Sequence, residues 1–235
     1  PYIDYQQLAD SDYTSDRIKK FIEEATGVTP TAKTSTTNET GTSSASGSSS
    51  AGTGTQTTDL STWTADKLEK TDLTQLPKLS EEQISTLINK FFSGSGSVMK
   101  ASDAAGIYQA QSQSGISALA LLGIGALESG WGTSDIANKT GNLWGWGATN
   151  SNPMGDAKRF SSNAGQAAVE YSNDLKSLYY DKRGAKSIYA IGTGDNPSGK
   201  GYAYLDDETT INTQWPKDVA NIMQQFTLLH NICYV

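Results

Sequence analysis

The fold of this chain is decided by residues 126–148, ALESGWGTSDIANKTGNLWGWGA, where one carboxylate stands among apolar residues, glycines and tryptophans. The residues around its start, ISALALLGIGALESG (116–130), are apolar on nearly every side. This pattern predicts a helix that is buried in the middle of a domain. Glu128 falls near the C-terminal end of that helix, directly before SGWG. We therefore expect a buried helix that ends in an acid.

A carboxylate at the edge of an apolar helix loses solvation, which disfavours its charged form and raises its pKa. A carboxyl group that stays protonated near neutral pH can protonate a leaving glycosidic oxygen. The alternative is a glutamate that contacts only solvent or a backbone N–H at the helix end. Trp131, Trp144 and Trp146 follow Glu128 closely and offer flat apolar faces for sugar rings, although each could also pack in the core. Together they favour a carbohydrate groove.

The chain after Pro77 has a mostly helical pattern. Ser80 and Gln83 form a capping box at the start of LSEEQISTLINKFF, residues 79–92. Further helices are predicted at residues 101–113, ending at Gly115, at residues 163–180, and from Pro216 onwards. Helical periodicity stops in LWGWGATNSNPMGDAKRF, residues 143–160, where short strands and turns are expected. The pattern predicts an α+β fold, mostly helical, with a small β insert.

Composition divides the chain into three predicted parts. Residues 1–28 form an N-terminal segment with a short amphipathic helix at 15–28, which cannot bury its apolar stripe alone. Residues 29–76 begin with a Ser/Thr/Gly-rich run typical of a flexible linker and end in an ambiguous stretch at 63–76, a helical turn or a wrapping arm. Residues 77–235 form the predicted domain. Residues 1–60 are expected to contact other subunits of a larger assembly.

The bulk composition excludes several classes of function. A net charge of −7 over 235 residues argues against nucleic acid as a partner, because phosphate binding requires a basic face. A single cysteine, Cys233, rules out an intramolecular disulfide, and His230 beside it is too local to define a Cys/His site. No run of 18 apolar residues predicts a membrane span, and the acidic N-terminus lacks the apolar region of a signal peptide.

The motif also carries a resemblance. ALESGWGTS followed by GNLWGWGA resembles the signature of the glucosaminidase domain of glycoside hydrolase family 73, in which a GNLFGI-type segment follows ALESGWGTS. The likeness extends over residues 79 to about 226 and does not cover residues 1–76. It implies a lysozyme-like fold, with a large helical lobe and a small β lobe that flank a substrate groove. It also implies cleavage of the β-1,4 bond after N-acetylglucosamine in peptidoglycan strands, with Glu128 as general acid. The substrate contacts expected in the groove are Trp131, Asn142, Trp144, Trp146 and Tyr202.

The second catalytic group is harder to place. Members of the family often carry another acid in the β lobe, where this chain offers Asp156 alone, while Asp135 could simply cap the following helix. In the alternative, substrate assistance, the 2-acetamido group attacks its own anomeric carbon, so one acid and an orienting hydroxyl suffice. The resemblance implies a closing tyrosine suited to that orienting role, for which Tyr202 and Tyr204 in GKGYAYLDDE are the candidates. We prefer Tyr204 and substrate assistance. No metal or organic cofactor is expected, because carboxylate-driven glycoside hydrolysis needs none.

Two other functions stay open at this point. One is a non-catalytic module that binds the cell wall or serves the assembly as a structural part. The other is a muramidase or lytic transglycosylase, which shares the lysozyme-like layout and cuts the neighbouring bond. The long tether and the helical N-terminus, without wall-binding repeats, favour an enzyme anchored in a phage particle, such as its tail, over a secreted autolysin or an endolysin. Such an enzyme would open the bacterial wall locally for DNA entry.

Overall fold

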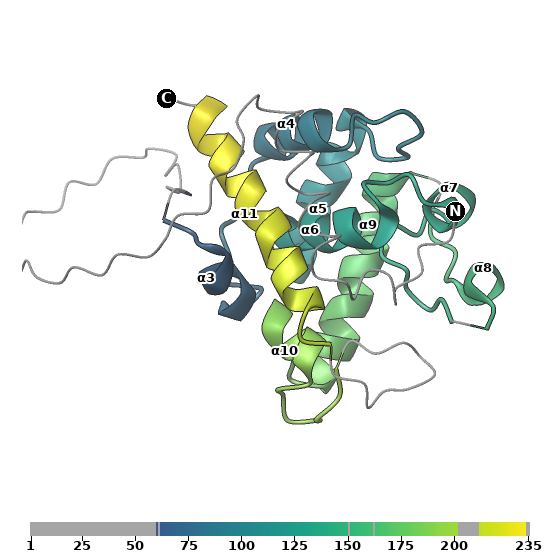
Figure 1. Cartoon of the computed structure of the whole chain (residues 1–235). Helices are drawn as coiled ribbons and strands as arrows, with labels where there is room; N and C mark the ends of the chain where they lie inside the picture. The colour runs from purple at the N-terminus through teal and green to yellow at the C-terminus, as the bar shows by residue number, and fades with distance from the viewer. Residues whose placement is uncertain (1–59, 61, 150, 162, 202–211, 234–235) are drawn as a thin grey trace, which may run out of the picture. The chain divides into compact units, whose positions relative to one another are not determined.

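A computed structural model of the 235-residue chain describes residues 60, 62–149, 151–161, 163–201 and 212–233. These residues lie in one compact unit, and they form helices joined by short loops (Figure 1). The predicted helix at 15–28 falls outside the described residues. In chain order the helices are α3 (Ala65–Lys70), α4 (Glu81–Phe91), the 3-10 turn η1 (Ala101–Asp103), α5 (Ala104–Ser114), α6 (Ala118–Ser129), α7 (Asp135–Thr140), α8 (Pro153–Asp156), α9 (Ala164–Leu175), the π-helix η2 (Lys176–Lys182), α10 (Ile188–Thr193) and α11 (Trp215–Cys233).

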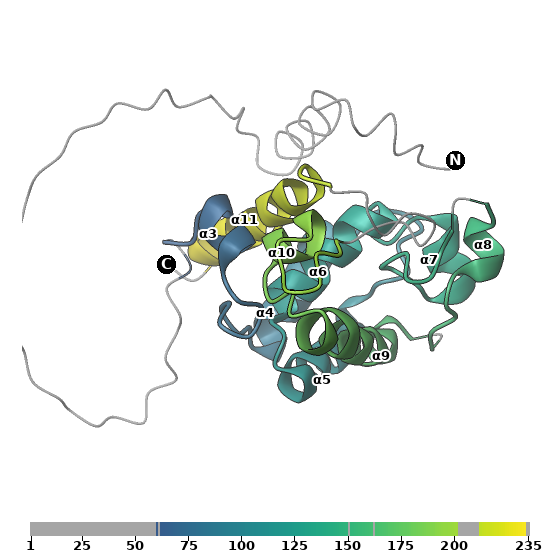
Figure 2. The ribbon, with the colours of Figure 1, turned by 90° about the horizontal axis from the view of Figure 1, so that it is seen from below.

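Helix α6 forms the centre of this unit, as its sequence predicts. Every non-glycine side chain from Ala118 to Ala126 is at most 1 % exposed. Helix α11 crosses α6 and packs against it, and α3 and α10 contact α11 in turn (Figures 1 and 2). Glycine at position 123 permits the close approach, since a Cβ there would lie 2.8 Å from Cγ of Met223 on α11. The buried helix that ends in Glu128 is therefore confirmed.

The stretch 63–76, which is ambiguous from sequence, forms α3 and a following turn. Leu68 and Leu73 are completely buried, and α3 packs against α11. The backbone N–H of Leu73 donates to the carbonyl of Lys186 (2.7 Å), while the carbonyl of Leu73 accepts from the N–H of Ser117 (3.1 Å). These bonds tie the segment to the beginning of α6 and to the loop before α10. The described helical body thus begins before residue 77, the predicted domain start.

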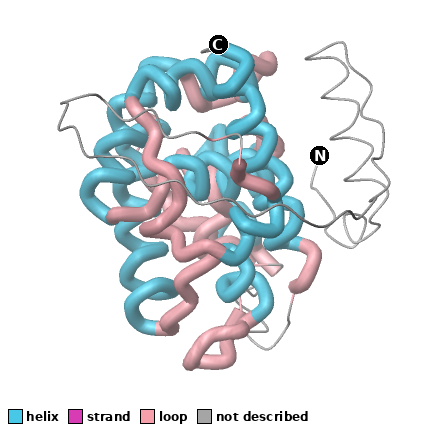
Figure 3. The backbone as a smooth tube through the Cα atoms, turned by 90° about the vertical axis from the view of Figure 1, so that its left-hand side faces the viewer, coloured by secondary structure: helices cyan, strands magenta, loops and turns pink. Residues whose placement is uncertain are grey.

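The residues expected to form a small β lobe contain no strand in the described segments 141–149 and 151–161 (Figure 3). They form turns and the short helix α8 instead. Single backbone bonds join the two arms of this region, from Lys158 N–H to Trp146 O and from Phe160 N–H to Thr140 O, each 2.9 Å long. Three glycines in this region have positive φ angles, which are not found in extended strands. They are Gly141 at 68°, Gly145 at 62° and Gly147 at 78°.

Several predicted helix ends are confirmed. Ser80 Oγ accepts from the N–H of Gln83 (3.2 Å) and Gln83 Oε1 accepts from the N–H of Ser80 (2.7 Å), which completes the capping box of α4. Gly115 ends α5 in a left-handed conformation, and Pro216 is the second residue of α11. None of the described helices combines the length and the apolar character that crossing a membrane requires. Local capping residues thus locate helix ends reliably in this chain.

Candidate active site

Glu128 lies in the last turn of α6, and the chain turns sharply directly after it. Gly130, Trp131 and Gly132 have φ angles of 56°, 63° and 83° in succession. Trp131 is the one non-glycine residue with a positive φ in the described part of the chain. A bulky residue in this conformation costs roughly 1–3 kcal/mol, so neighbouring contacts must hold it there. One is the bond from the Trp131 N–H to the carbonyl of Ala126, 2.9 Å long.

The Trp131 ring supplies the remaining support. It stacks on Phe91 of α4, with centroids 5.8 Å apart and planes at 19°. It also meets Phe92 and Phe226 edge-on, at 5.7 and 6.3 Å. The half-buried indole therefore joins α4 and α11 to the end of α6. Packing in the core was the alternative left open for Trp131 from sequence, and this packing fixes the backbone that carries Glu128.

A tryptophan from the far end of the domain binds the acid. Trp215 Nε1 donates to Glu128 Oε1 over 2.6 Å, and Trp215 itself is 7 % exposed. Trp215 is the first residue of α11, where its backbone N–H donates to Asn212 Oδ1 (2.9 Å). Helix α10 packs closely here, because a Cβ at Gly192 would lie 2.6 Å from Pro216 and 3.0 Å from the Trp215 ring. The indole is thus held in place from two directions.

The loop that carries GNLWGWGA passes the other side of the carboxylate. A Cβ built on Gly145 would lie 3.5 Å from Glu128 Oε2. Gly145 has a φ of 62°, a conformation in which glycine avoids steric cost. The two oxygens of Glu128 therefore have different neighbours. Oε1 meets the indole N–H of Trp215, and Oε2 lies beside the backbone of Gly145.

Asn142 shapes this loop. Its Oδ1 accepts from the backbone N–H groups of Trp144 (3.2 Å) and Trp146 (3.0 Å). Its Nδ2 donates to the carbonyls of Trp146 (2.8 Å) and Lys158 (3.1 Å). The residue is 1 % exposed, so its amide is engaged by the backbone and covered. The amide of Asn142 thus replaces backbone pairing in the turn, which speaks against the substrate contact predicted for this residue.

The two tryptophans of the loop have different environments. Trp144 is 1 % exposed, its Nε1 donates to the carbonyl of Leu121 (3.0 Å), and its ring stacks on Tyr171 at 4.4 Å and 7°. The ring thus packs in the core, which speaks against the substrate contact predicted at Trp144. Trp146 is half-buried, with its ring against Tyr171 (5.5 Å) and Tyr179 (5.8 Å).

Tyr171 of α9 lies in contact with both of these tryptophans. It is completely buried, and its hydroxyl forms no hydrogen bond with any described residue. Burial raises the pKa of Tyr171 well above its ordinary value, and the negative charge of Glu128 is the next largest cause. Tyr171 therefore keeps its proton close to the acid.

Of the remaining predicted site residues, one is bonded within its own loop and two lie outside the described segments. Asp156 is exposed on α8, where Oδ2 accepts from Thr149 Oγ1 (2.5 Å) and Oδ1 from Asn152 Nδ2 (3.3 Å). Its carboxylate is thus bonded within its own loop. Tyr202 and Tyr204 lie outside the described residues. Among the residues that are described, no three His, Cys, Asp or Glu side chains gather as metal ligands would.

The family of the chain follows from its sequence match. The glucosaminidase family model, described as mannosyl-glycoprotein endo-β-N-acetylglucosaminidase, matches residues 104–228, more than half of the chain. The chain belongs to the glucosaminidase family. It is a glycoside hydrolase of the endo-β-N-acetylglucosaminidase type, which confirms the resemblance carried by ALESGWGTS and GNLWGWGA. No curated protein matches the sequence.

Solved structures of S. aureus autolysin E resemble this glucosaminidase in fold. The enzyme alone has a TM-score of 0.54 at 16 % identity, covering 72 % of this chain and 74 % of that chain. Two complexes have the same score at 17 % identity, covering 70 % and 73 %. One holds the muropeptide NAM-L-Ala-D-iGlu, and the other is a catalytic mutant with the disaccharide NAG-NAM. At this identity the likeness establishes a shared fold.

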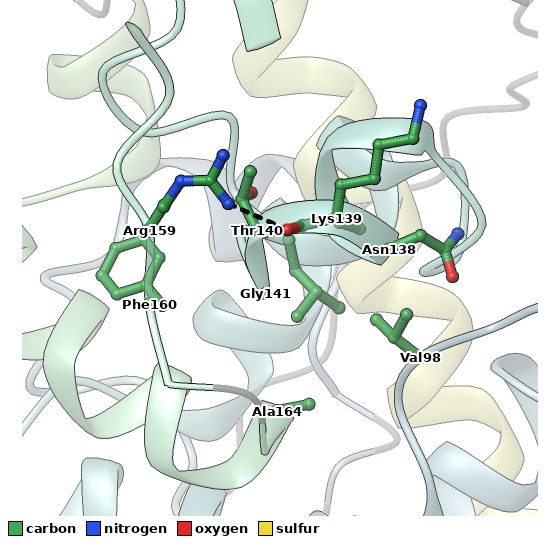
Figure 4. Close-up of a pocket in the computed structure, with 10 residues that line it drawn as sticks. Val98, Asn138, Lys139, Thr140, Gly141, Arg159, Phe160 and Ala164 are labelled. Atoms are coloured by element: carbon green, nitrogen blue, oxygen red, sulfur yellow. Dashed lines mark hydrogen bonds between the residues drawn. The ribbon is translucent and has the colours of Figure 1, made fainter. Parts of the chain in front are cut away.

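In this glucosaminidase a cavity of about 240 Å³ lies at the end of α7 (Figure 4). Arg159 Nη1 donates to the carbonyl of Lys139 (3.2 Å), and Lys139 Nζ pairs with Asp135 (3.3 Å). Ser134 rather than Asp135 caps α7, since its Oγ accepts from the helix backbone. The cavity is lined by Val98, Ala137, Asn138, Lys139, Thr140, Gly141, Leu143, Arg159, Phe160 and Ala164. Glu128 does not line this cavity.

Sequence reasoning missed two residues of this site, Trp215 and Tyr171. A signal for Trp215 existed, because the resemblance covers a closing segment in which a tryptophan follows a tyrosine. Tyr171 carried no signal, since an aromatic residue on a helix is usually part of the core. Trp215 reaches Glu128 only through the packing of α11 on α6, and Tyr171 reaches the loop beside Glu128 through its contacts with Trp144 and Trp146.

Proposed function

We propose that this glucosaminidase hydrolyses the β-1,4 glycosidic bond after N-acetylglucosamine in peptidoglycan strands, with Glu128 as general acid. The observation that carries the proposal is the 2.6 Å hydrogen bond from Trp215 Nε1 to Glu128 Oε1, which holds the acid at the end of α6 with its other oxygen beside the Gly145 loop. The likeness of fold to autolysin E, solved with NAG-NAM and with a muropeptide, supports the choice of substrate.

The geometry gives the two carboxyl oxygens separate tasks. Oε1 accepts the indole hydrogen bond, so the catalytic proton is assigned to Oε2, on the side of Gly145. When this proton passes to the leaving glycosidic oxygen, the C–O bond breaks and Glu128 becomes a carboxylate. An indole N–H can only donate, so the bond from Trp215 strengthens as negative charge appears. A contact that gains strength towards the transition state accelerates the chemical step.

The second half of the reaction is assigned to the substrate. The carbonyl oxygen of the 2-acetamido group attacks the anomeric carbon as the leaving group departs, and water later opens the resulting ring. The hydroxyl of Tyr204 is proposed to orient the acetamido group. Asp156 is assigned no catalytic step, because its exposed carboxylate accepts hydrogen bonds from Thr149 and Asn152 and so holds its own loop together.

Sugar contacts are assigned to the exposed parts of the aromatic residues near the acid. Trp131 and Trp146 are half-buried, so part of each ring faces outwards. Tyr202 stays in the proposed set on the strength of the motif alone. Stacking of sugar rings on such faces would place the scissile bond above Glu128.

The decisive variant is Glu128→Gln, which keeps the hydrogen-bond acceptor for Trp215 but cannot transfer a proton. We expect the release of reducing ends from purified peptidoglycan to fall by about 10²–10⁴-fold, the range typical of a lost general acid. The matched control is Glu82→Gln, an exposed position on α4. Circular dichroism and thermal unfolding should show both variants folded. A folded Glu128→Gln protein with normal activity would refute the assignment.

Product analysis separates the enzyme classes. Mass spectrometry should find N-acetylglucosamine at the new reducing end of each fragment. Muramic acid at that end would indicate a muramidase, and an anhydro-sugar a lytic transglycosylase. Binding to the wall without any new end would indicate a non-catalytic module. Cleavage of a mannosylated glycopeptide in place of peptidoglycan would move the substrate towards the one in the family description.

The biological setting is a separate part of the proposal. We propose that the enzyme acts from a phage particle, held to tail proteins through residues 1–60. The amphipathic pattern at 15–28 offers an apolar stripe for a partner, and the Ser/Thr/Gly-rich composition of the run after it is typical of a linker. Deletion of residues 1–57, which spares the buried Leu60, should keep activity on isolated walls and abolish incorporation into particles. Purified virions without the protein would contradict this setting.

A further inference from the structure

One buried hydroxyl near the acid has no evident reason to be there. Three buried side-chain atoms in the described part of the chain have no hydrogen-bond partner: Ser97 Oγ, Gln225 Oε1 and the hydroxyl of Tyr171. A buried polar group without a partner is costly, and phenylalanine would fill the same space without that cost. Tyr171 lies close enough to Glu128 for the charge of that carboxylate to raise the pKa of Tyr171, after burial itself. The hydroxyl therefore calls for a functional explanation.

The ring of Tyr171 is locked in place. It lies flat against Trp144, with centroids 4.4 Å apart, and meets the edge of Trp146 at 5.5 Å. Gly145, between these tryptophans, is the residue that approaches Glu128 Oε2. Tyr171 thus supports the loop that borders the acid, and it cannot turn its hydroxyl to the surface.

Three titratable groups act on Tyr171 from the elements around it. They are Glu128 at the end of α6, Tyr179 on the π-helix and Asp174 on α9 itself, in decreasing order of influence. Asp174 is already paired with Lys158, and the guanidinium of Arg183 lies over the ring of Tyr179 at 4.6 Å. Of these three groups, Glu128 has the largest effect on the pKa of Tyr171, and the loop of Trp144 to Trp146, against which the ring of Tyr171 packs, approaches Glu128 Oε2 at Gly145.

We propose that Tyr171 is a positioning residue for the acid, whose hydroxyl donates through one bound water to the Glu128 carboxylate. The proposal rests on Glu128 being the general acid. Waters commonly bridge buried polar groups that do not touch directly, with little loss against a direct bond. Trp215 donates to the carboxylate from α11, and Tyr171 donates from α9. Two uncharged donors on different helices then stabilise the charge that remains when the proton leaves.

The substitution Tyr171→Phe tests this role, because it removes only the hydroxyl. We expect the midpoint of thermal unfolding to stay unchanged or rise, since an unpaired buried group is lost. We expect kcat/KM on peptidoglycan to fall about 10-fold, the scale of one hydrogen bond to a charged group. Activity falls with rising pH as the acid loses its proton. Without its donor the carboxylate forms less readily, so this basic limb of the profile should move to higher pH.

The matched control is Tyr108→Phe, on the exposed face of α5 at 43 % exposure, which should match the wild type in all three measurements. A Tyr171→Phe protein with wild-type kcat/KM and an unmoved basic limb would overturn the inference. So would a loss of activity that only follows a loss of folded protein. If Glu128→Gln is inactive in the same assay, the proposed function survives either result. An active Glu128→Gln would instead defeat the proposed function itself.

Discussion

The two halves of the motif at residues 126–148 hold their tryptophans in different ways. In ESGWGTS, the ring of Trp131 packs between helices and supports a left-handed backbone at the end of α6. In GNLWGWGA, the side chain of Asn142 replaces regular pairing, so Trp144 turns into the core while Trp146 stays half-exposed. The first half carries the acid and the second half borders it. A tryptophan near an acid in sequence is therefore a framework residue as readily as a sugar contact.

The largest expected effect separates the two tryptophans of the second half. Trp144→Ala removes a fully buried indole, its stack on Tyr171 and its bond to the carbonyl of Leu121. We expect the free energy of unfolding to fall by about 3–5 kcal/mol in denaturant titrations, as for other large core truncations. Trp146 is half-buried, so Trp146→Ala should lower the free energy of unfolding clearly less than Trp144→Ala does. It should lower the activity more. Equal losses of stability would remove the distinction between a core and a groove tryptophan.

The next effect concerns the partner that the acid receives from α11. Trp215→Phe keeps an aromatic ring but loses the N–H that binds Glu128 Oε1. We expect kcat/KM to fall about 10- to 100-fold, equivalent to roughly 1.4–2.7 kcal/mol of transition-state stabilisation. The control Trp63→Phe changes a half-buried tryptophan that lies under Lys67 near α3, and it should leave activity unchanged. A Trp215→Phe enzyme with normal activity would show that packing alone orients the acid.

These contrasts show what the sequence could predict. The buried helix and the capping box of Ser80 and Gln83 depend on neighbouring residues, so periodicity and spacing located them. The bond between Glu128 and Trp215 joins residues 87 positions apart, and no local pattern encodes it. Side chains two positions apart, as in Trp144 and Trp146, gave no indication of which one faces the core. That choice depends on how α9 and α6 pack around the loop.

The described residues of the predicted β lobe form turns instead of strands, for a related reason. Glycines and aromatic residues in LWGWGATNSNPMGDAKRF fit both short strands and irregular turns, so composition did not separate the two. The positive φ angles of Gly145 and Gly147, together with the amide of Asn142, decide for turns in the described segments. A side chain that satisfies backbone groups leaves little for a neighbouring strand to pair with.

A smaller effect tests why glycine is needed beside the acid. Gly145→Ala places a methyl group 3.5 Å from Glu128 Oε2 and forces alanine into a left-handed conformation, at about 1–2 kcal/mol. Gly199→Ala is a matched control, since Gly199 has a similar φ of 66° and open space around its Cβ position. Both should lose similar stability by thermal unfolding, while only Gly145→Ala should also lower kcat/KM. Equal activities would show that the loop does not border the reacting oxygen.

The smallest expected effect is that of Asp156→Asn, which tests whether a second catalytic acid follows the motif. In Asp156→Asn the side-chain oxygen can still accept a hydrogen bond from Thr149 or Asn152, and the position is exposed. Stability should therefore change by less than about 0.5 kcal/mol, as at other surface sites, with kcat/KM nearly unchanged. Tyr204→Phe should cost far more activity, because the hydroxyl assigned to orient the acetamido group is lost. The opposite order would mean that Asp156 acts on the reaction as a second acid. Two carboxylates would then share the chemistry, and the loop after GNLWGWGA would carry catalysis as well as bordering Glu128.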